Sequence, residues 1–311
     1  MVWGGRRLAD ILHKPLPTGE PYGESWEISD HALHQSRVAA GPRTGQTLRG
    51  LIEESPREIL GKAEAATFPW LVKFLDASDW LSVQVHPDEE AVRRLWPGEG
   101  SKTEAWFVVD AAPDSRIYAG LLPGCDEKSL RHHLERGTVA ECLHSFVPQA
   151  GDCVFLRAGT VHAVGGGVLI AEIQQTSDAT FRLFDWNRRD AQGKPRTLHI
   201  EQALACVDWR RGPVDPVRAS GFASGSTSGS QRQPLVRCEY FDIEFVSIDG
   251  PMILGGSRRP AVFVVLGGEG RWTGEDGGEI AAGQAWLLPA AMPERTLTPT
   301  QRLSALLCTL P

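Results

Sequence analysis

The chain has 311 residues, of which 41% are hydrophobic and 23% are charged, and its formal net charge at pH 7 is −7. These proportions are typical of a folded globular protein of about two domains and exclude a disordered or fibrous chain. The acidic balance and the lack of a dense lysine and arginine tract exclude a broad nucleic-acid or anionic-membrane surface, whereas a phosphorylated small molecule needs only a few local cations.

The beginning of the chain, MVWGGRR, is not followed by an apolar core of the signal-peptide type. No run reaches the roughly 18 apolar residues that a membrane helix requires. We therefore expect a cytoplasmic protein without a membrane partner. The six cysteines are scattered and form no C-x-x-C pair, which argues against a disulfide scaffold and a cysteine-built zinc site. Any metal must then be bound by histidine, carboxylate or amide groups.

The first part of the chain predicts short strands and one helix. A strand is expected at 25–29, and a helix at 48–60, where leucine and isoleucine recur at helical spacing. The apolar segments 70–75 and 80–85 flank turn-forming residues at 76–79, which predicts a β-hairpin.

The second of these segments has two different faces. Ser82, Gln84 and His86 share one side of the expected strand, whereas Val83 and Val85 point to the other side. A strand with polar residues on one face and aliphatic residues on the other can line a cavity.

The middle of the chain combines helices with strands. A helix is expected over 88–95, and a strong strand over 105–110, with Glu104 at its entrance. Residues 126–144 predict one or two helices that carry solvent-facing histidines, among them His144.

From residue 150 the pattern changes to short strands separated by glycine-rich turns, which suggests an antiparallel sandwich or barrel. The expected strands are 151–156, 159–164, 168–174 and 180–185. The triplet at 165–167 is better explained as a tight turn than as a nucleotide loop, because no helix with a phosphate-binding pattern follows it.

The remaining sequence predicts a helix at 197–207, a Ser/Gly-rich linker at 219–234 and a second all-β region at 235–311. We therefore predict a mainly β protein of two barrels with a small helical excursion. We expect the first domain to cover residues 1–218 and to contain any metal site, whereas residues 235–311 form a C-terminal barrel that has no histidines and is expected to bind no metal.

Three segments contain the residues for one zinc site. A hydrolytic or Lewis-acid zinc needs about three nitrogen or oxygen ligands and an open position. Gln84 and His86 share a strand face, Glu104 opens the next main strand, and His162 follows a tight turn in a later strand. Such residues can converge inside a barrel, although the same spacing also fits histidines held by ordinary hydrogen bonds.

The sequences of four segments resemble those of type I mannose-6-phosphate isomerases, in their short bacterial form. The segments are LSVQVHPDEE at 81–90, KTEAW at 102–106, GTVHAVGGG at 159–167 and EIQQTSDATFRLFDW at 172–186. The resemblance extends in order over most of residues 1–210, and residues 235–311 match only by the position of a second barrel.

The resemblance implies a cupin fold of the jelly-roll type, one zinc ion per chain, and the interconversion of mannose 6-phosphate and fructose 6-phosphate. By position, the zinc ligands of the family correspond to His86, Glu104 and His162. Gln84 matches an amide ligand of the long forms, and its alternative role is a hydrogen-bonded side chain beside the metal.

The arginine of the family's active-site segment corresponds to Arg182, whose guanidinium suits an enediolate oxyanion. The transfer of a proton between C1 and C2 of the sugar requires a base, and the sequence does not rank the three candidate residues for this role. These candidates are Lys102, Glu172 and Asp178. By position, Ser82, Lys102 and Arg188 are candidates for binding the substrate phosphate, and Arg182 could share that role.

Two other functions remain open at this point. A non-catalytic cupin that binds a sugar phosphate would keep the metal ligands without needing Arg182 or a base. An iron-dependent cupin oxygenase would use His86, Glu104 and His162 as a 2-His-1-carboxylate triad. We expect a monomer or a homodimer.

Overall fold

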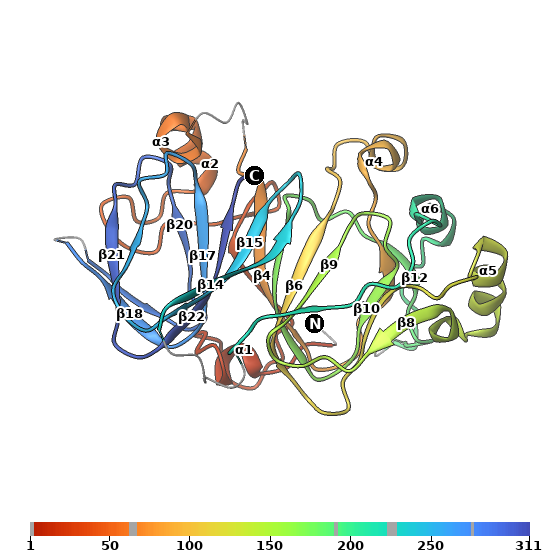
Figure 1. Cartoon of the computed structure of the whole chain (residues 1–311). Coiled ribbons are helices and arrows are strands. Elements are labelled where there is room, and N and C mark those ends of the chain that lie inside the picture. The colour runs from red at the N-terminus through yellow and green to blue at the C-terminus, as the bar shows by residue number, and fades with distance from the viewer. Residues whose placement is uncertain (1–2, 62–66, 190–191, 223–228, 275–276) are drawn as a thin grey trace. The chain divides into compact units, whose positions relative to one another are not determined.

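The computed structural model describes residues 3–61, 67–189, 192–222, 229–274 and 277–311 (Figure 1). The fold is mainly β, as predicted, and the chain divides into two compact units. The first unit comprises Met1–Gly5, Pro21–Glu24 and Leu75–Val217. The second comprises Arg6–Glu20, Ser25–Phe74 and Arg218–Pro311.

The predicted boundary at residue 218 lies where the chain passes from the first unit to the second. The prediction, however, placed residues 25–74 in the first domain. The structure assigns this early segment to the second unit. One physical reason is that Ala290 and Ala291 donate backbone hydrogen bonds to the carbonyls of Ile59 and Glu58, at 3.1 and 2.8 Å. The two compact units are therefore not separated at a single point of the chain, and the predicted domain boundaries stay a prediction.

Two sheets contain most strands of residues 24–218. The larger sheet has the order β1-β4-β11-β6-β9-β13, and the smaller has the order β12-β5-β10-β7-β8. The strands of the larger sheet are β1 (Glu24–Ile28), β4 (Trp70–Ala77), β11 (Val168–Gln175), β6 (Glu104–Ala111), β9 (Asp152–Leu156) and β13 (Val217–Arg218). Those of the smaller are β12 (Phe181–Phe184), β5 (Val83–Val85), β10 (His162–Val164), β7 (Ile117–Leu121) and β8 (Leu143–Phe146).

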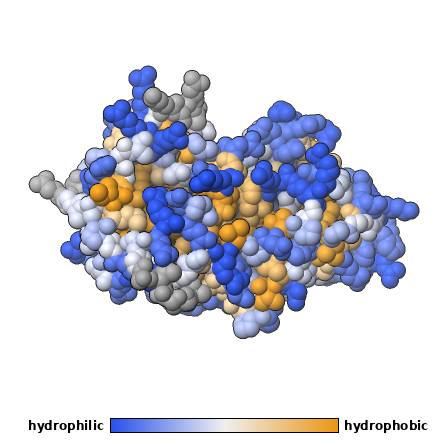
Figure 2. All heavy atoms as spheres, in the orientation of Figure 1, coloured by the Kyte–Doolittle hydropathy of each residue, from blue (hydrophilic) through white to orange (hydrophobic). Residues whose placement is uncertain are grey.

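Helices cover one face of the smaller sheet. They are α4 (Glu89–Leu95), α5 (Glu127–Arg136), the 3-10 helix η1 (Val139–Cys142) and α6 (Ile200–Cys206). Val83 and Val85 pack in one hydrophobic cluster with Leu130 of α5 and Leu204 of α6. The predicted aliphatic face of this strand is therefore confirmed. Figure 2 shows a hydrophilic outer surface over α5, which presents its charged side chains to solvent.

The predicted hairpin of residues 70–85 is wrong. Its two strands, β4 and β5, lie in different sheets, where β4 is next to β11 and β5 is next to β12 and β10. The segment between them is held by longer-range bonds: the Leu81 amide donates to the Val164 carbonyl at 2.8 Å, and the Trp186 indole donates to the Leu81 carbonyl at 2.6 Å. Tertiary partners therefore override the local turn signal.

Two predicted helices are shorter than expected. The segment 48–60 forms α2 (Leu48–Glu54) and α3 (Pro56–Leu60), because proline disfavours a helical conformation at Ser55, whose φ and ψ are −141° and 62°. The segment 126–144 leaves the helical conformation at Gly137, a left-handed cap with φ 70°. His144 consequently lies on β8, where Nε2 is 2.9 Å from the Asp215 carboxylate.

The second unit has its own sheets and hydrophobic core, with Phe263 and Leu297 fully buried. Its sheet orders are β14-β15-β22-β17-β20, β16-β21-β18-β19 and β2-β3. The elements not yet given are α1 (Arg7–Asp10), β2 (Asp30–His31), β3 (His34–Gln35), β14 (Gln231–Arg237), β15 (Asp242–Ile248), β16 (Met252–Leu254), β17 (Ala261–Gly267), β18 (Glu269–Trp272), β19 (Glu279–Ala281), β20 (Ala285–Leu288), β21 (Arg295–Pro299) and β22 (Leu303–Thr309).

The predicted linker at 219–234 is only partly described, because residues 223–228 lie outside the described ranges. Its last residues belong to β14, which begins at Gln231. The two closed barrels stay a prediction. None of the described helices combines the length and the apolar character that crossing a membrane would take.

Candidate metal centre and active site

Three predicted metal ligands converge inside the first unit. His86 follows β5, Glu104 opens β6 and His162 opens β10, so the three residues come from both sheets. Their ligand atoms lie within 4.8 Å of one another, and all three side chains are buried. The Glu104 carboxylate lies between the rings, with its oxygens 3.4 Å from Nε2 of His86 and 3.5 Å from Nε2 of His162.

Both imidazoles are oriented by backbone carbonyls. Nδ1 of His86 donates to the carbonyl of Ala179 at 2.8 Å, and Nδ1 of His162 donates to the carbonyl of Thr160 at 2.8 Å. Since a carbonyl oxygen can only accept, the proton of each neutral ring is on Nδ1 and the lone pair is on Nε2. The two Nε2 atoms therefore face Glu104 as potential ligands.

Burial keeps both rings neutral. It lowers the pKa of His86, with a further contribution from the Lys102 ammonium, and it lowers the pKa of His162 to about 3, with a further contribution from His86. Burial by itself would raise the pKa of Glu104, but Lys102 and the histidines hold it well below its usual range. Neutral imidazoles beside an ionised carboxylate are the protonation states that metal binding requires.

The buried polar atoms of this cluster fit a divalent cation. Nε2 of His86 and both carboxylate oxygens of Glu104 are buried, and among the described residues only Lys102 offers a hydrogen-bond donor to any of them. The Lys102 ammonium lies 3.0 Å from one of these oxygens as an ion pair. Buried acceptors without donors are costly. A cation coordinated by the nitrogen and oxygen atoms of these residues would remove that cost.

Three adjacent strands place Arg182, Gln84 and His162 in one row. Gln84 of β5 lies opposite His162 of β10 and opposite Arg182 of β12 in the strand register. Residues directly opposite one another in antiparallel strands project to the same face. With neighbouring strands about 4.8 Å apart, the row spans about 10 Å between the outer residues. The face opposite the helices therefore carries both a candidate metal ligand, His162, and the predicted catalytic arginine.

The Gln84 amide is positioned beside the metal ligands. Its Nε2 atom lies 3.3 Å from Nε2 of His162. A half-turn of the amide would place its oxygen there instead, so both roles predicted for Gln84 are compatible with its position.

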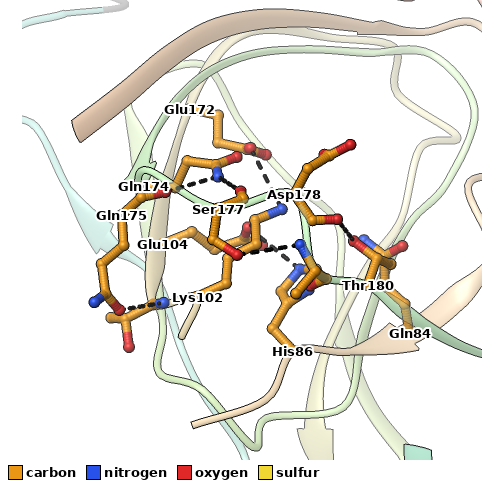
Figure 3. A network of polar contacts seen from close by, with 12 residues as sticks. Gln84, His86, Lys102, Glu104, Glu172, Gln174, Gln175, Ser177, Asp178 and Thr180 are labelled. Carbon is orange, nitrogen blue, oxygen red and sulfur yellow. Dashed lines mark hydrogen bonds and ion pairs between the residues drawn. The ribbon is translucent and has the colours of Figure 1, made fainter. Parts of the chain in front are cut away.

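A chain of buried polar groups extends from Glu104 (Figure 3). Nζ of Lys102 is 3.0 Å from Glu104 and 3.9 Å from Glu172, and the other oxygen of Glu172 accepts from the indole of Trp106 at 2.9 Å. Burial opposes the charge of Lys102, but Glu104 and Glu172 raise its pKa above the ordinary value. Lys102 is therefore an ammonium group at neutral pH.

Trp106 was not predicted as a site residue. It lies two positions after Glu104 on β6, so the alternation of a strand places both side chains on one face. Its partner Glu172 lies directly opposite on β11. The sequence signal for Trp106 was the alternation of side chains along the strand, which places it on the same face as Glu104. This signal could point to a site residue only once the pairing of β6 with β11 was known.

The guanidinium of Arg182 is half-buried. It donates to the Thr197 carbonyl at 2.8 Å, and it forms no ion pair with a carboxylate of the described residues. Burial lowers its pKa, and the nearby charge of Arg196 lowers it further. This excess of positive charge is suited to an anionic ligand.

The other predicted site residues occupy different positions. Asp178 is exposed on the loop between β11 and β12, whereas Ser82 is buried just before β5. Arg188 follows β12 and is ion-paired with Asp185 at 2.6 Å and with Asp79 at 3.4 Å. The structure thus brings together the three metal ligands, Lys102 and Glu172, and it places Arg188 in its own cluster of charges.

Comparisons with known proteins agree with this geometry. Residues 1–109, which include His86 and Glu104, match the family model of the phosphomannose isomerase type I catalytic domain. The mannose-6-phosphate isomerase of Streptococcus mutans is 37% identical over 272 residues, which are 88% of this chain and 83% of that protein. The ManA mannose-6-phosphate isomerase of Bacillus subtilis is 35% identical over 94% of this chain and 91% of its own.

The fold is also similar to a solved structure over nearly its whole length. The crystal structure of the Bacillus subtilis mannose 6-phosphate isomerase superposes with a TM-score of 0.88 at 32% identity, covering 99% of this chain and 96% of that one. Both sequence and fold thus agree with the resemblance noted above, and the chain belongs to the type I mannose-6-phosphate isomerase family.

Proposed function

We propose that this chain interconverts mannose 6-phosphate and fructose 6-phosphate at one zinc ion held by His86, Glu104 and His162. The observation that carries the proposal is the set of buried ligand atoms, Nε2 of His86 and the two Glu104 oxygens, which face one another and have no donor among the described residues apart from Lys102 beside one oxygen. Membership of a metal-dependent isomerase family supports the same reaction. Gln84 is the candidate for a fourth ligand, through its amide oxygen.

A bound zinc ion would supply Lewis-acid chemistry to the sugar oxygens at C1 and C2. Glu172 is our candidate for the base that moves the proton between these carbons, because it is a buried carboxylate within the polar chain that starts at Glu104. Lys102, held as an ammonium, would donate a hydrogen bond to a substrate oxygen rather than remove a proton. Asp178, being exposed, is the less favourable alternative.

The arginines around β12 are suited to the anionic parts of the substrate. Arg182 has no carboxylate partner among the described residues, and its face is shared with Gln84 and His162. We propose that Arg182 stabilises the enediolate and shares the phosphate with Arg188 and Ser82. Lys102 could bind the substrate phosphate only if it gave up its ion pairs with Glu104 and Glu172.

The test is an isomerase assay on mannose 6-phosphate before and after exhaustive chelation. We expect activity that the chelator abolishes and that zinc restores, because the ligand set is of the nitrogen and oxygen type that zinc prefers. Metal analysis of protein purified without added metal should give one zinc per chain. Activity that survives complete metal removal would refute the proposal.

The same preparation separates the two alternatives. An iron-dependent oxygenase would contain iron and consume oxygen, whereas a non-catalytic sugar-phosphate-binding protein would bind mannose 6-phosphate without turning it over. We also propose a cytoplasmic location, which the six free cysteines support because thiols stay reduced there.

A further inference from the structure

The two metal-binding histidines are supported in different ways. His162 donates to Thr160, which lies two residues before it. His86 donates to Ala179, which lies 93 positions later in the chain, in the loop between β11 and β12. The orientation of His86 therefore depends on how that loop is held, whereas the orientation of His162 is a local property of its own segment.

Ser177 is the residue that holds this loop. Its hydroxyl accepts a hydrogen bond from the Ala179 amide at 3.1 Å and donates to the Gly100 carbonyl at 2.7 Å. Ser177 and Ala179 are both fully buried. One hydroxyl thus joins Ala179, the residue whose carbonyl orients His86, to the segment that leads into Lys102 and Glu104.

The amide of Gln174 fixes the same loop from the side of β11 (Figure 3). Its Nε2 atom donates to the Ser177 carbonyl at 2.5 Å and to the Gln175 carbonyl at 2.9 Å. The neighbouring Gln175 side chain accepts from the Thr103 amide at 2.9 Å and donates to the Ser101 hydroxyl at 3.0 Å. The loop is therefore fastened to the segment before Glu104 at several points.

We propose that Ser177 is a positioning residue for the metal centre, which acts by fixing the Ala179 carbonyl and thereby the Nδ1-protonated form and the ring plane of His86. The inference rests on the proposed zinc site. Loss of the hydroxyl leaves the buried Ala179 amide without its acceptor and releases the loop from Gly100. Ligands that lose such a support bind zinc about 10- to 100-fold more weakly.

The experiment compares zinc release to a chelator for wild type, Ser177→Ala and Ser29→Ala, all loaded with one zinc. Ser29 is the matched control, because its buried hydroxyl donates to the His34 carbonyl at 2.6 Å and accepts from the His31 amide at 3.2 Å. Ser177→Ala should release zinc at least about 10-fold faster, whereas Ser29→Ala should release it at the wild-type rate. Equal rates in all three proteins, or equal acceleration in both variants, would overturn the proposal.

Two further measurements keep the proposal testable if Ser177→Ala does not fold. Ser177→Thr retains the hydroxyl and should release zinc at the wild-type rate. Rapid zinc release from this variant would contradict the proposed role of the hydroxyl. Nitrogen NMR of the zinc-loaded wild type should show the proton of His86 on Nδ1, and a proton on Nε2 would refute the mechanism. A wild-type protein that binds no zinc would instead refute the proposed function.

Discussion

At the scale of single residues, Trp106 connects two parts of the candidate site. Its indole donates to Glu172, and its ring meets His162 edge to face, with centroids 5.2 Å apart and planes at 84°. One side chain therefore constrains both the candidate base and a metal ligand. The indole of Trp106 itself has no titratable group.

Replacing Trp106 by phenylalanine should lower kcat/KM about 10-fold, because a lost hydrogen bond to a charged group is worth about 1.5 kcal/mol. The zinc content should not change, since phenylalanine keeps an aromatic ring against His162. The matched control is Trp70→Phe, which removes a buried indole donor to the Tyr240 carbonyl in the second unit. Steady-state kinetics that show the same loss in both variants would contradict this role of Trp106.

Arg182→Ala should lower kcat at least about 100-fold, the scale of losing one oxyanion stabiliser. Arg182→Lys should recover only part of the rate, because lysine keeps the charge but not the planar fork of donors. Arg232→Ala serves as a control, since this arginine is ion-paired with Glu244 on the surface of the second unit. A fully active Arg182→Ala enzyme would rule out the proposed role.

The candidate metal ligands could be proposed from the sequence, but the residues that support them could not. His86, Glu104 and His162 stand in distinctive local segments, so their residue types and motifs point to them directly. The Ala179 carbonyl and the Ser177 hydroxyl are different, because any residue supplies a carbonyl and serines are common in loops. Their roles follow from a contact across 93 positions of the chain, which no local pattern encodes.

At the scale of secondary structure, the predictions succeeded where burial determines the pattern of apolar residues along a strand. They failed where the neighbouring strand in the sheet had to be predicted. The strand at β6 was predicted almost in full because its residues form a continuous apolar run. Residues 76–79 predict a turn, but Asp76 and Ala77 belong to β4, and the local sequence could not reveal that β4 and β5 enter different sheets. Pairing depends on side chains from β11 and β12, which lie about a hundred residues later.

The caps of α5 give a direct test at this scale. The Asp126 carboxylate accepts from the Ser129 amide at 2.8 Å and so caps the first turn. Asp126→Ala should lower the free energy of unfolding by about 1 kcal/mol, whereas Asp126→Asn should cost much less because asparagine is an equally good cap. Urea unfolding, together with amide hydrogen exchange in α5, measures both. Equal losses in the two variants would show that charge rather than capping matters.

At the scale of the whole molecule, the candidate metal centre of the first unit draws on two different sheets. Its ligands come from β6 in the larger sheet and from β10 and the end of β5 in the smaller one. An ion bound there would therefore link the sheets. The stability of this unit should then depend on the concentration of free zinc.

Free zinc at about 100 times its dissociation constant should raise the free energy of unfolding by about 2.7 kcal/mol, provided that the unfolded chain binds no zinc. Thermal melts across a zinc titration would measure the shift. His162→Gln should melt at a temperature that does not respond to zinc, because it lacks one ligand. A wild-type melting temperature that is independent of zinc would contradict a site between the sheets.

The order of the ligands along the chain has a consequence for biosynthesis. His86 and Glu104 leave the ribosome first, followed by His162, and Ala179 emerges last. Since β11 inserts between β4 and β6, the larger sheet cannot close until most of this unit has been translated. A nascent chain that stops before residue 179 lacks the carbonyl that orients His86. If the proposed zinc site forms, metal capture in the final geometry would consequently be a late event, and truncated translation products would bind zinc poorly.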